Sequence, residues 1–281
     1  MASLLSVENL QVQFQTKKGI NTAVDGVSFS VEKGRILGIV GESGCGKSVT
    51  SMSILQLLGS NARISGGSIK LDGKELIGLP EKEMCRIRGN DIAMIFQDPM
   101  TALNPTLTIG TQLMEPIMLH QNCGKKEAWT RAVDVLKRVG IAAPEKRMKE
   151  YPHQLSGGMR QRVMIAMAVS CEPRLLIADE PTTALDVTIQ AQILELMCEL
   201  REKMGTAIML ITHDMGVVAE TADDVLVLYA GKAVEYGSIE DIFERPKHPY
   251  TQGLLNSIPR LDEDVELLNT IEGTVPAPDA M

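Results

Sequence analysis

The first 35 residues alternate apolar and polar side chains over short stretches. This period of two residues is typical of β-strands with one buried face, and it predicts strands over residues 4–10, 11–15 and 27–31, with a turn at 17–19. Residues 35–40 are nearly all apolar instead, which is typical of a strand buried on both faces in a parallel sheet. The pattern therefore predicts a β-rich start that leads into a buried sheet.

Strands and helices alternate along most of the remaining chain. Further strands are predicted at residues 66–73, 91–96, 175–178, 207–212, 225–229 and 232–235, and helices at 49–58 and 187–203. Helical patterns also fill residues 99–167, interrupted by Pro105, Pro116, Pro144 and Pro152. After residue 239 the chain is rich in proline, and no helix or strand is predicted there. This alternation indicates an α/β protein with a parallel sheet and a helical insert in its middle.

Composition narrows the class of protein. A chain of 281 residues with 44% hydrophobic and 23% charged residues has ample material for a core, and it is not a disordered or collagen-like chain. The 36 acidic and 28 basic residues give a net charge of −8, which argues against non-specific binding of nucleic acid. No apolar run approaches the ~20 residues that span a bilayer, and no secretory signal is visible. We expect a soluble cytoplasmic chain that can dock on a membrane protein.

Residues 41–48 read GESGCGKS, a complete GxxxxGK[ST] motif between the strand at 35–40 and a helix. Its glycines let backbone N–H groups turn towards an anion, and the helix points its positive end at the same place. Lys47 can reach the β- and γ-phosphates of a nucleotide, and the Ser48 hydroxyl can bind Mg²⁺. The alternative is a glycine-rich turn that matches by chance, which the strand–loop–helix context disfavours. The predicted nucleotide contacts are Gly41, Ser43, Gly44, Cys45, Gly46, Lys47, Ser48 and Val49.

An acidic pair follows the apolar strand at 175–178. Asp179 is predicted to hold the Mg²⁺ shell through water, and Glu180 to orient and polarise an attacking water as general base. The alternative is a surface acidic pair, which is common at strand ends. The presence of the phosphate-binding motif makes that alternative the weaker one.

Residues 155–159 read LSGGM and precede a helix. This segment resembles the signature motif of the ATP-binding cassette (ABC) family, although Met159 replaces the more usual glutamine. Backbone N–H groups at a helix N-terminus again favour an anion. The resemblance implies that Ser156, Gly157 and Gly158 close over ATP that a second subunit holds.

Four other positions match motifs of the same family. Gln97 resembles the glutamine that touches Mg²⁺ and the attacking water, and His213 resembles the switch histidine at the γ-phosphate. Asp186 ends the segment 184–186, which resembles the loop that communicates across the cassette dimer. Phe14 falls where the family places an aromatic side chain against adenine; a lone phenylalanine in an edge strand is more often part of a core.

The family resemblance implies a P-loop NTPase fold of the ABC ATPase type. Such a fold has a RecA-like parallel sheet, an N-terminal antiparallel β subdomain and a helical insert subdomain. The implied division is an ATP-binding core at 1–97 and 171–240, a helical signature subdomain at 98–170 and a C-terminal extension at 241–281.

Two further segments, 96–105 and 248–255, look like the dipeptide/oligopeptide importer branch of the family, which also includes nickel importers. The resemblance implies an ATPase subunit that uses ATP and Mg²⁺ at the cytoplasmic face of the membrane. Its implied partners are a second, non-identical ABC ATPase, two membrane permeases and an extracytoplasmic solute-binding protein. The sequence leaves the cargo open, and it also leaves open whether the two ATPases of the dimer are identical, although the resemblance favours a non-identical pair. The direction of transport rests on resemblance alone.

Cysteine usage gives two smaller expectations. Five cysteines occur without a CxxC pair, and none follows Cys198, whereas several members of the branch carry a later cysteine cluster that resembles an iron–sulfur site. Two alternatives are open, a chain that lacks this site or a sequence that is truncated before it, and we predict no iron–sulfur cluster in this chain. Cys45 lies inside the GxxxxGK[ST] motif, where one interpretation is that its sulfur simply fills a small space. Because a helix N-terminus can lower the pKa of a thiol, the other hypothesis is sensitivity to alkylating agents.

Two rival functions remain at this point. One is a cassette ATPase that acts on nucleic acid or ribosomes, which the acidic charge and the segment 248–255 disfavour. The other is a regulatory module that holds ATP without hydrolysing it, which the presence of Glu180 and His213 disfavours.

Overall fold

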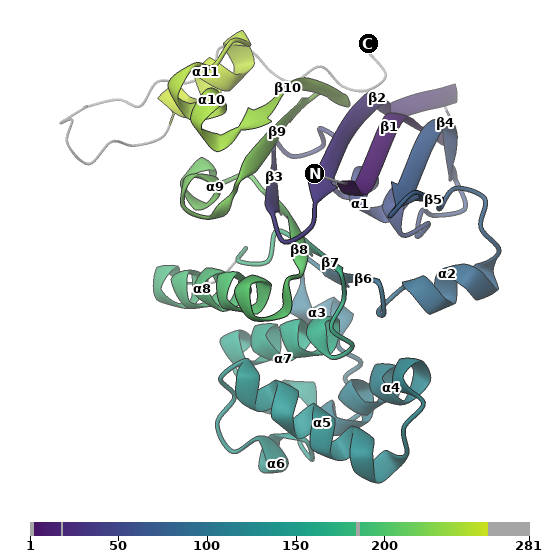
Figure 1. Cartoon of the computed structure of the whole chain (residues 1–281), viewed down its shortest axis with the longest axis vertical. Coiled ribbons are helices and arrows are strands. Elements are labelled where there is room, and N and C mark those ends of the chain that lie inside the picture. Colours follow the sequence, from purple (N-terminus) through teal and green to yellow (C-terminus); the bar gives the residue numbers. More distant parts are fainter. Residues whose placement is uncertain (1–2, 18, 184–185, 258–281) are drawn as a thin grey trace. The chain divides into compact units, whose positions relative to one another are not determined.

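The computed structural model describes residues 3–17, 19–183 and 186–257, and these form two compact units (Figure 1). The first unit comprises Met1–Leu79 and Met209–Met281, and the second comprises Pro80–Ile208. The division at residues 97, 170 and 240 implied by the family resemblance stays a prediction, and the two compact units change over at other positions.

An antiparallel sheet opens the first unit. Its strand order is β2-β1-β4-β5, with β1 at Ser3–Thr16, β2 at Gly19–Glu32, β4 at Ala62–Leu71 and β5 at Lys74–Glu75. The two strands predicted over residues 4–15 form the single strand β1, because register shifts near Asn9, whose φ is +48°, absorb the break in the alternation. Leu5, Leu10 and Val12 are fully buried, so one face of the sheet packs on the core.

The first unit also holds part of a second sheet, with strand order β10-β9-β3. The central strand of the three, β9 (Asp224–Tyr229), pairs in parallel with β3 (Ile36–Val40) and antiparallel with β10 (Lys232–Ser238). All five residues of β3 are buried, as its apolar run predicts. The strand β8 (Ala207–Thr212) crosses the boundary between the units in the sequence.

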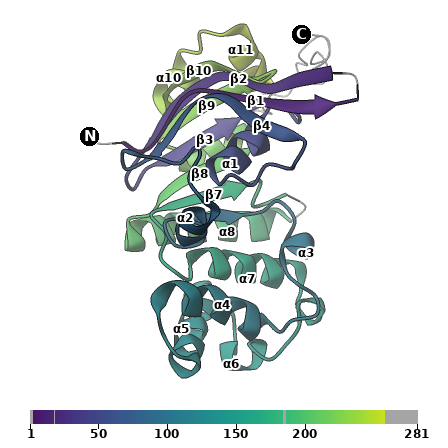
Figure 2. The same cartoon turned by 90° about the vertical axis from the view of Figure 1, so that its right-hand side faces the viewer.

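Short helices complete the first unit: α1 (Lys47–Ile54), α9 (Met215–Thr221), α10 (Ile239–Glu244) and α11 (Pro249–Asn256). The last two lie beside β10 in both views (Figures 1 and 2). Neither was predicted, because the prolines near them suggested irregular chain. Pro249 instead occupies the first turn of α11, where a missing N–H costs nothing, and Ser238 caps α10 by accepting from the N–H of Asp241 at 3.2 Å.

The second unit contains a parallel strand pair and most of the helices. The strands are β6 (Ile92–Ile95) and β7 (Leu175–Asp179), paired so that Ile95 lies opposite Ala178. The helices are α2 (Glu81–Ile87), α3 (Pro99–Ala102), α4 (Ile109–Gln121), α5 (Lys125–Arg138), α6 (Pro144–Arg147), the 3₁₀ turn η1 (Pro152–Gln154), α7 (Gly157–Val169) and α8 (Val187–Met204).

One predicted break is wrong: α4 continues through Pro116. A proline inside a helix removes one backbone hydrogen bond, so packing must compensate. Ile109, Leu113 and Ile117 are fully buried on α4, and the helix packs against α5 and α7 (Figure 2). Burial of this apolar face holds α4 together where local sequence favours a break. Among the described residues, no helix has the length and apolar character needed to cross a membrane.

Candidate functional site

The loop between β3 and α1, residues 41–46, follows a path that needs glycine at two positions. The φ of Gly41 is +152°, and a Cβ there would lie 2.2 Å from the carbonyl oxygen of Leu228. The φ of Gly46 is +103°, and a Cβ there would lie 2.8 Å from the carbonyl oxygen of Ala23. Both conformations and both close approaches exclude a larger side chain.

The helix α1 starts at Lys47, two residues before the predicted start, with Gly46 as a cap that has no side chain to offer. Its first backbone N–H groups therefore have no acceptor within the helix and point towards the loop. The first intrahelical bond runs from the N–H of Thr50 to the carbonyl of Gly46 at 2.9 Å. A helix that begins without a side-chain cap after a glycine-rich loop is suited to bind an anion.

The first two side chains of α1, directly after the loop, differ sharply in exposure. Lys47 is only 6% exposed, and its Nζ donates to the carbonyl oxygens of Gly41 at 2.6 Å and Glu42 at 2.9 Å. Ser48 is exposed, so its hydroxyl is accessible at the start of α1. Gly44 is also exposed, with φ +83° and open space around the position of a Cβ. Ser43 is exposed and Val49 is half-buried.

The expectation for Cys45 is wrong. The side chain is buried, with 1% of it exposed, and burial raises the pKa of its thiol, an effect that the nearby Lys47 charge offsets only in part. The thiol therefore stays protonated and is shielded from reagents. The sequence indicated the helix N-terminus and could not show the burial.

The strands β6 and β7 bring the acidic pair and Gln97 together in the second unit. Neighbouring parallel strands end at the same edge, so the residues after them meet there. Asp179, at the end of β7, is 5% exposed. Nε2 of Gln97 donates to Oε2 of Glu180 at 2.8 Å.

The backbone of Glu180 is strained, with φ +46° in a residue other than glycine. Its carboxylate also accepts from the hydroxyl of Thr183 at 3.0 Å. Gln161, which is 2% exposed on α7, donates its side-chain N–H to the carbonyl oxygen of Pro181 in the same turn. Sequence reasoning missed Thr183 and Gln161, because their partners become visible only once the turn is folded.

The signature segment also lies in the second unit. Ser156 caps α7, and its hydroxyl accepts from the N–H of Met159 at 3.3 Å. Gly157 is exposed with no atom near the position of a Cβ, whereas a Cβ on Gly158 would lie 3.3 Å from Ile189. The backbone at the start of α7 is thus accessible. Ser156 and Gly157 are both exposed.

The remaining predicted residues lie on other elements. Asp186 caps α8 by accepting from the N–H of Ile189 at 3.0 Å, while residues 184 and 185 of the same predicted loop lie outside the described residues. His213 is exposed directly after β8. Phe14 lines a cavity of about 120 Å³ at the end of the antiparallel sheet.

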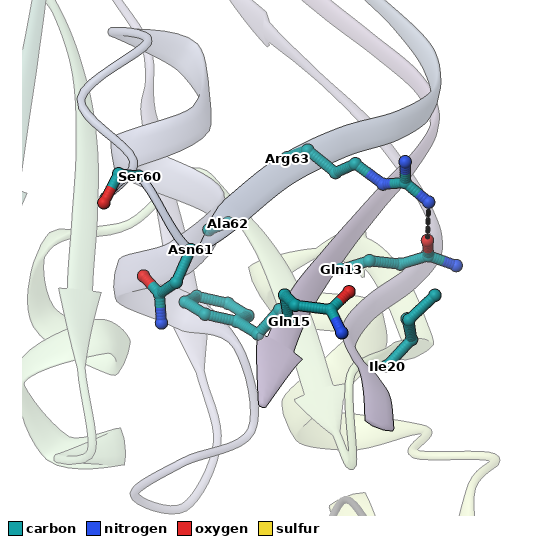
Figure 3. A pocket seen from close by; sticks show the side chains of 8 residues that line it. Gln13, Gln15, Ile20, Ser60, Asn61, Ala62 and Arg63 are labelled. Carbon is teal, nitrogen blue, oxygen red and sulfur yellow. Dashed lines mark hydrogen bonds between the residues drawn. The ribbon is translucent and has the colours of Figure 1, made fainter. Parts of the chain in front are cut away.

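Figure 3 shows the side chains around that cavity, with Arg63 donating to Gln13 at 3.2 Å. Ile20, Asn61 and Ala62 also line it. An aromatic ring beside a small open cavity is compatible with two roles, stacking on a flat ligand and packing in the core. The role of Phe14 stays a prediction.

The predicted residues thus fall into two main groups, one in each compact unit. In the first unit, residues 41–49 form a loop and helix start suited to an anion. In the second, Gln97, Asp179 and Glu180 form an acidic cluster at two strand ends. Among the described residues, no group of three or more His, Cys, Asp and Glu side chains forms a metal centre. Oxygen atoms from serine, glutamine and aspartate are nevertheless the donor type that Mg²⁺ prefers.

The chain belongs to the ABC transporter family, whose model matches residues 24–183. A second family model, described as the C-terminal region of oligopeptide/dipeptide transporters, matches residues 234–281. With this fold and these motifs the chain is an ABC ATPase, as the resemblance implied.

Individual relatives are similar over nearly the whole chain. The identity is 58% over 280 residues to the oligopeptide transport ATP-binding protein AppD of Bacillus subtilis, covering 99% of this chain and 85% of AppD. It is 58% over 277 residues to the dipeptide transport ATP-binding protein DppD of the same species, covering 98% and 83%. It is 55% over 274 residues to the oligopeptide transport ATP-binding protein OppD of Escherichia coli, covering 98% and 81%.

Solved structures agree with the fold. A dimeric post-hydrolysis structure of the ATP-binding cassette MJ0796, bound to ADP and Pi, has a TM-score of 0.75 and 27% identity. That match covers 84% of this chain and 98% of the cassette. The predicted ABC ATPase architecture is confirmed.

Proposed function

We propose that this chain is the ATP-hydrolysing subunit that powers an importer of peptides, or of nickel or a related small solute, through membrane permeases. One observation carries the proposal: an ABC ATPase chain also matches the C-terminal region of oligopeptide/dipeptide transporters at residues 234–281. The named peptide-transport relatives support it with 55–58% identity across nearly the full chain.

The loop of the first unit fits the phosphates of ATP. Glycine at positions 41 and 46 lets the backbone turn its N–H groups inward, and the buried Lys47 adds a positive charge. The contacts in this account are Gly41, Ser43, Gly44, Cys45, Gly46, Lys47, Ser48 and Val49, with Phe14 against the base.

Three of the predicted residues, Ser48, Gln97 and Asp179, offer oxygen donors that suit Mg²⁺. In the first unit the exposed Ser48 hydroxyl is the donor that the family resemblance assigns to the ion, and in the second unit the assigned donors are Gln97 and Asp179. When bound, the ion neutralises negative charge on the β- and γ-phosphates. Both Ser48 and Asp179 carry hard oxygen donors, which match this cation.

Glu180 is the residue that we assign to activating water. Gln97 and Thr183 both donate to its Oε2 and so fix the carboxylate, and an ionised carboxylate is a group that can take a proton from water. His213 is assigned to the γ-phosphate. Ser156, Gly157, Gly158 and Asp186 are assigned to ATP held by a second cassette.

The partners follow from the same proposal. MJ0796 forms a dimer in its solved structure, and we infer that this chain also pairs with a second ABC ATPase, a non-identical one. Two permeases and an extracytoplasmic solute-binding protein would complete the importer. The chain would lie at the cytoplasmic face of the membrane as a peripheral subunit, and no nucleic acid would take part.

Affinity purification of this chain from mildly solubilised membranes of its host, followed by mass spectrometry, tests the proposal. We expect a second cassette ATPase and two multi-span proteins, and the accompanying binding protein would identify the cargo. A Lys47→Ala chain is purified in parallel. Proteins recovered equally with both chains do not depend on ATP binding by the loop. Recovery of only soluble partners or ribosomes would overturn the transport function and leave the ATPase standing.

A further inference from the structure

A tyrosine from the C-terminal part of the first unit contacts the phosphate-binding loop. The backbone N–H of Glu42 donates to the hydroxyl oxygen of Tyr250 at 3.1 Å, although the two residues are 208 positions apart. Tyr250 is only 7% exposed and lies in the first turn of α11. The loop therefore receives a side chain from a segment that is distant in the sequence.

The position of Tyr250 is itself fixed. Glu235 on β10 accepts from the backbone N–H groups of Lys247 at 2.7 Å and His248 at 3.0 Å, which sets the start of α11. Nδ1 of His248 then accepts from the N–H of Tyr250 at 3.2 Å. The ring of Tyr250 packs on that of Tyr229, with centroids 4.5 Å apart and planes tilted by 49°.

Other bonds hold the same loop at different atoms. The N–H of Gly231 donates to the carbonyl of Cys45 at 3.1 Å, and Lys47 donates to the carbonyls of Gly41 and Glu42. These bonds fix carbonyl oxygens. The bond to Tyr250 fixes an N–H group instead, the one that follows Gly41. Since the direction of a peptide plane decides where its neighbouring N–H groups point, this bond bears on the anion site itself.

The phenol is suited to accept this bond next to an anion. Burial raises the pKa of Tyr250 to about 12, so the hydroxyl stays neutral at physiological pH. It accepts from Glu42 without placing a negative charge beside the phosphates. A carboxylate at the same place would accept more strongly and repel the nucleotide.

We propose that Tyr250 is a positioning residue that orients the Glu42 peptide and thereby sets the affinity of the loop for nucleotide. The C-terminal segment from β10 to α11 is then part of the nucleotide site and not only an appended region. This inference rests on the proposed binding of ATP by the same loop.

Tyr250→Phe tests it, with Tyr229→Phe as the matched control. Both variants lose one hydroxyl of the same ring pair, but only the first removes the acceptor for Glu42. The KM for ATP and the kcat of full-length protein are measured with Mg²⁺ present, together with the Kd for ATP. We expect the KM and Kd of Tyr250→Phe to rise about 3- to 10-fold, the usual effect of one hydrogen bond, with kcat within about twofold.

A merely structural role gives a different result. Partial unfolding lowers the active fraction and so kcat, but leaves KM unchanged, and that outcome would overturn the proposal. Equal KM values in the two variants would overturn it as well. Lys47→Ala tests the assumption that the loop binds ATP. If the wild-type chain binds ATP no better than this variant, that assumption is wrong, and the proposed role of Tyr250 is wrong with it.

Discussion

The phosphate-binding loop of the first unit and the acidic cluster of the second are built in different ways. Both follow the end of a parallel strand, and both contain a residue with positive φ. In the loop that residue is glycine, because backbone atoms approach within the reach of a Cβ at Gly41. In the cluster it is Glu180, whose backbone is strained at the position that places its carboxylate.

This difference indicates a division of labour. In the proposed function the loop binds with backbone N–H groups, so its shape should matter more than its side chains, apart from Lys47. In the same proposal the cluster acts through side chains, and Gln97 and Thr183 both donate to one oxygen of Glu180. Nucleotide binding and nucleotide hydrolysis should therefore be separable by mutation.

The largest effect on binding is expected from Lys47→Ala. This change removes the one charge of the loop that is nearly buried, and charge-assisted bonds to phosphate are strong. We expect the Kd for ATP to rise about 100-fold in isothermal titration calorimetry. Lys33→Ala is the control, because Lys33 makes an exposed ion pair with Asp72 at 3.4 Å. An affinity of Lys47→Ala close to that of the control would contradict the account.

A smaller effect, on stability, is expected from Gly41→Ala. Its Cβ would lie 2.2 Å from a backbone oxygen, which no rotation of a side chain relieves. We expect the free energy of unfolding to fall by about 3 kcal/mol in a denaturant titration. Gly44→Ala has open space and only an unfavourable φ, so it should cost about 1 kcal/mol. Equal losses in the two variants would show that the close approach at Gly41 is not the cause.

Much of the fold could be predicted from the sequence, because its signals are local. The apolar runs over 35–40, 175–178 and 207–212 match β3, β7 and β8 to within a residue, since buried parallel strands are apolar throughout. The continuation of α4 through Pro116 could not be predicted, because the packing of α4 against other helices overrides the local preference of proline for a helix break. Helix α11 was missed because the prolines suggested irregular chain, whereas Pro249 lies in the first turn of the helix.

The candidate site shows the same limit. Glycines, Lys47 and the acidic pair stand out because their spacing is short and their chemistry specific. Tyr250 and Gln161 did not stand out, because each acts through a bond to a backbone atom far away in the sequence. Cys45 was misjudged, since burial cannot be read from its neighbours along the chain.

The smallest expected effect concerns Cys45. Since burial raises the pKa of its thiol, less thiolate is present at any pH below that pKa than in the unfolded chain. Iodoacetamide should therefore modify Cys45 more slowly than the exposed Cys85 in the native protein, and the difference should vanish in denaturant. Peptide mass spectrometry over a time course measures both sites. Faster modification of Cys45 than of Cys85 in the native state would refute the assigned burial.

The separation of binding from hydrolysis is tested most directly with Glu180→Gln. The Kd for ATP and the rate of phosphate release are measured on the same preparation, beside wild type and Lys47→Ala. Glutamine keeps the size of the side chain and loses the base, so we expect an ATP affinity within about twofold of wild type and phosphate release lower by about 100-fold or more. Phosphate release at the wild-type rate, or a loss of affinity as large as that of Lys47→Ala, would contradict the account.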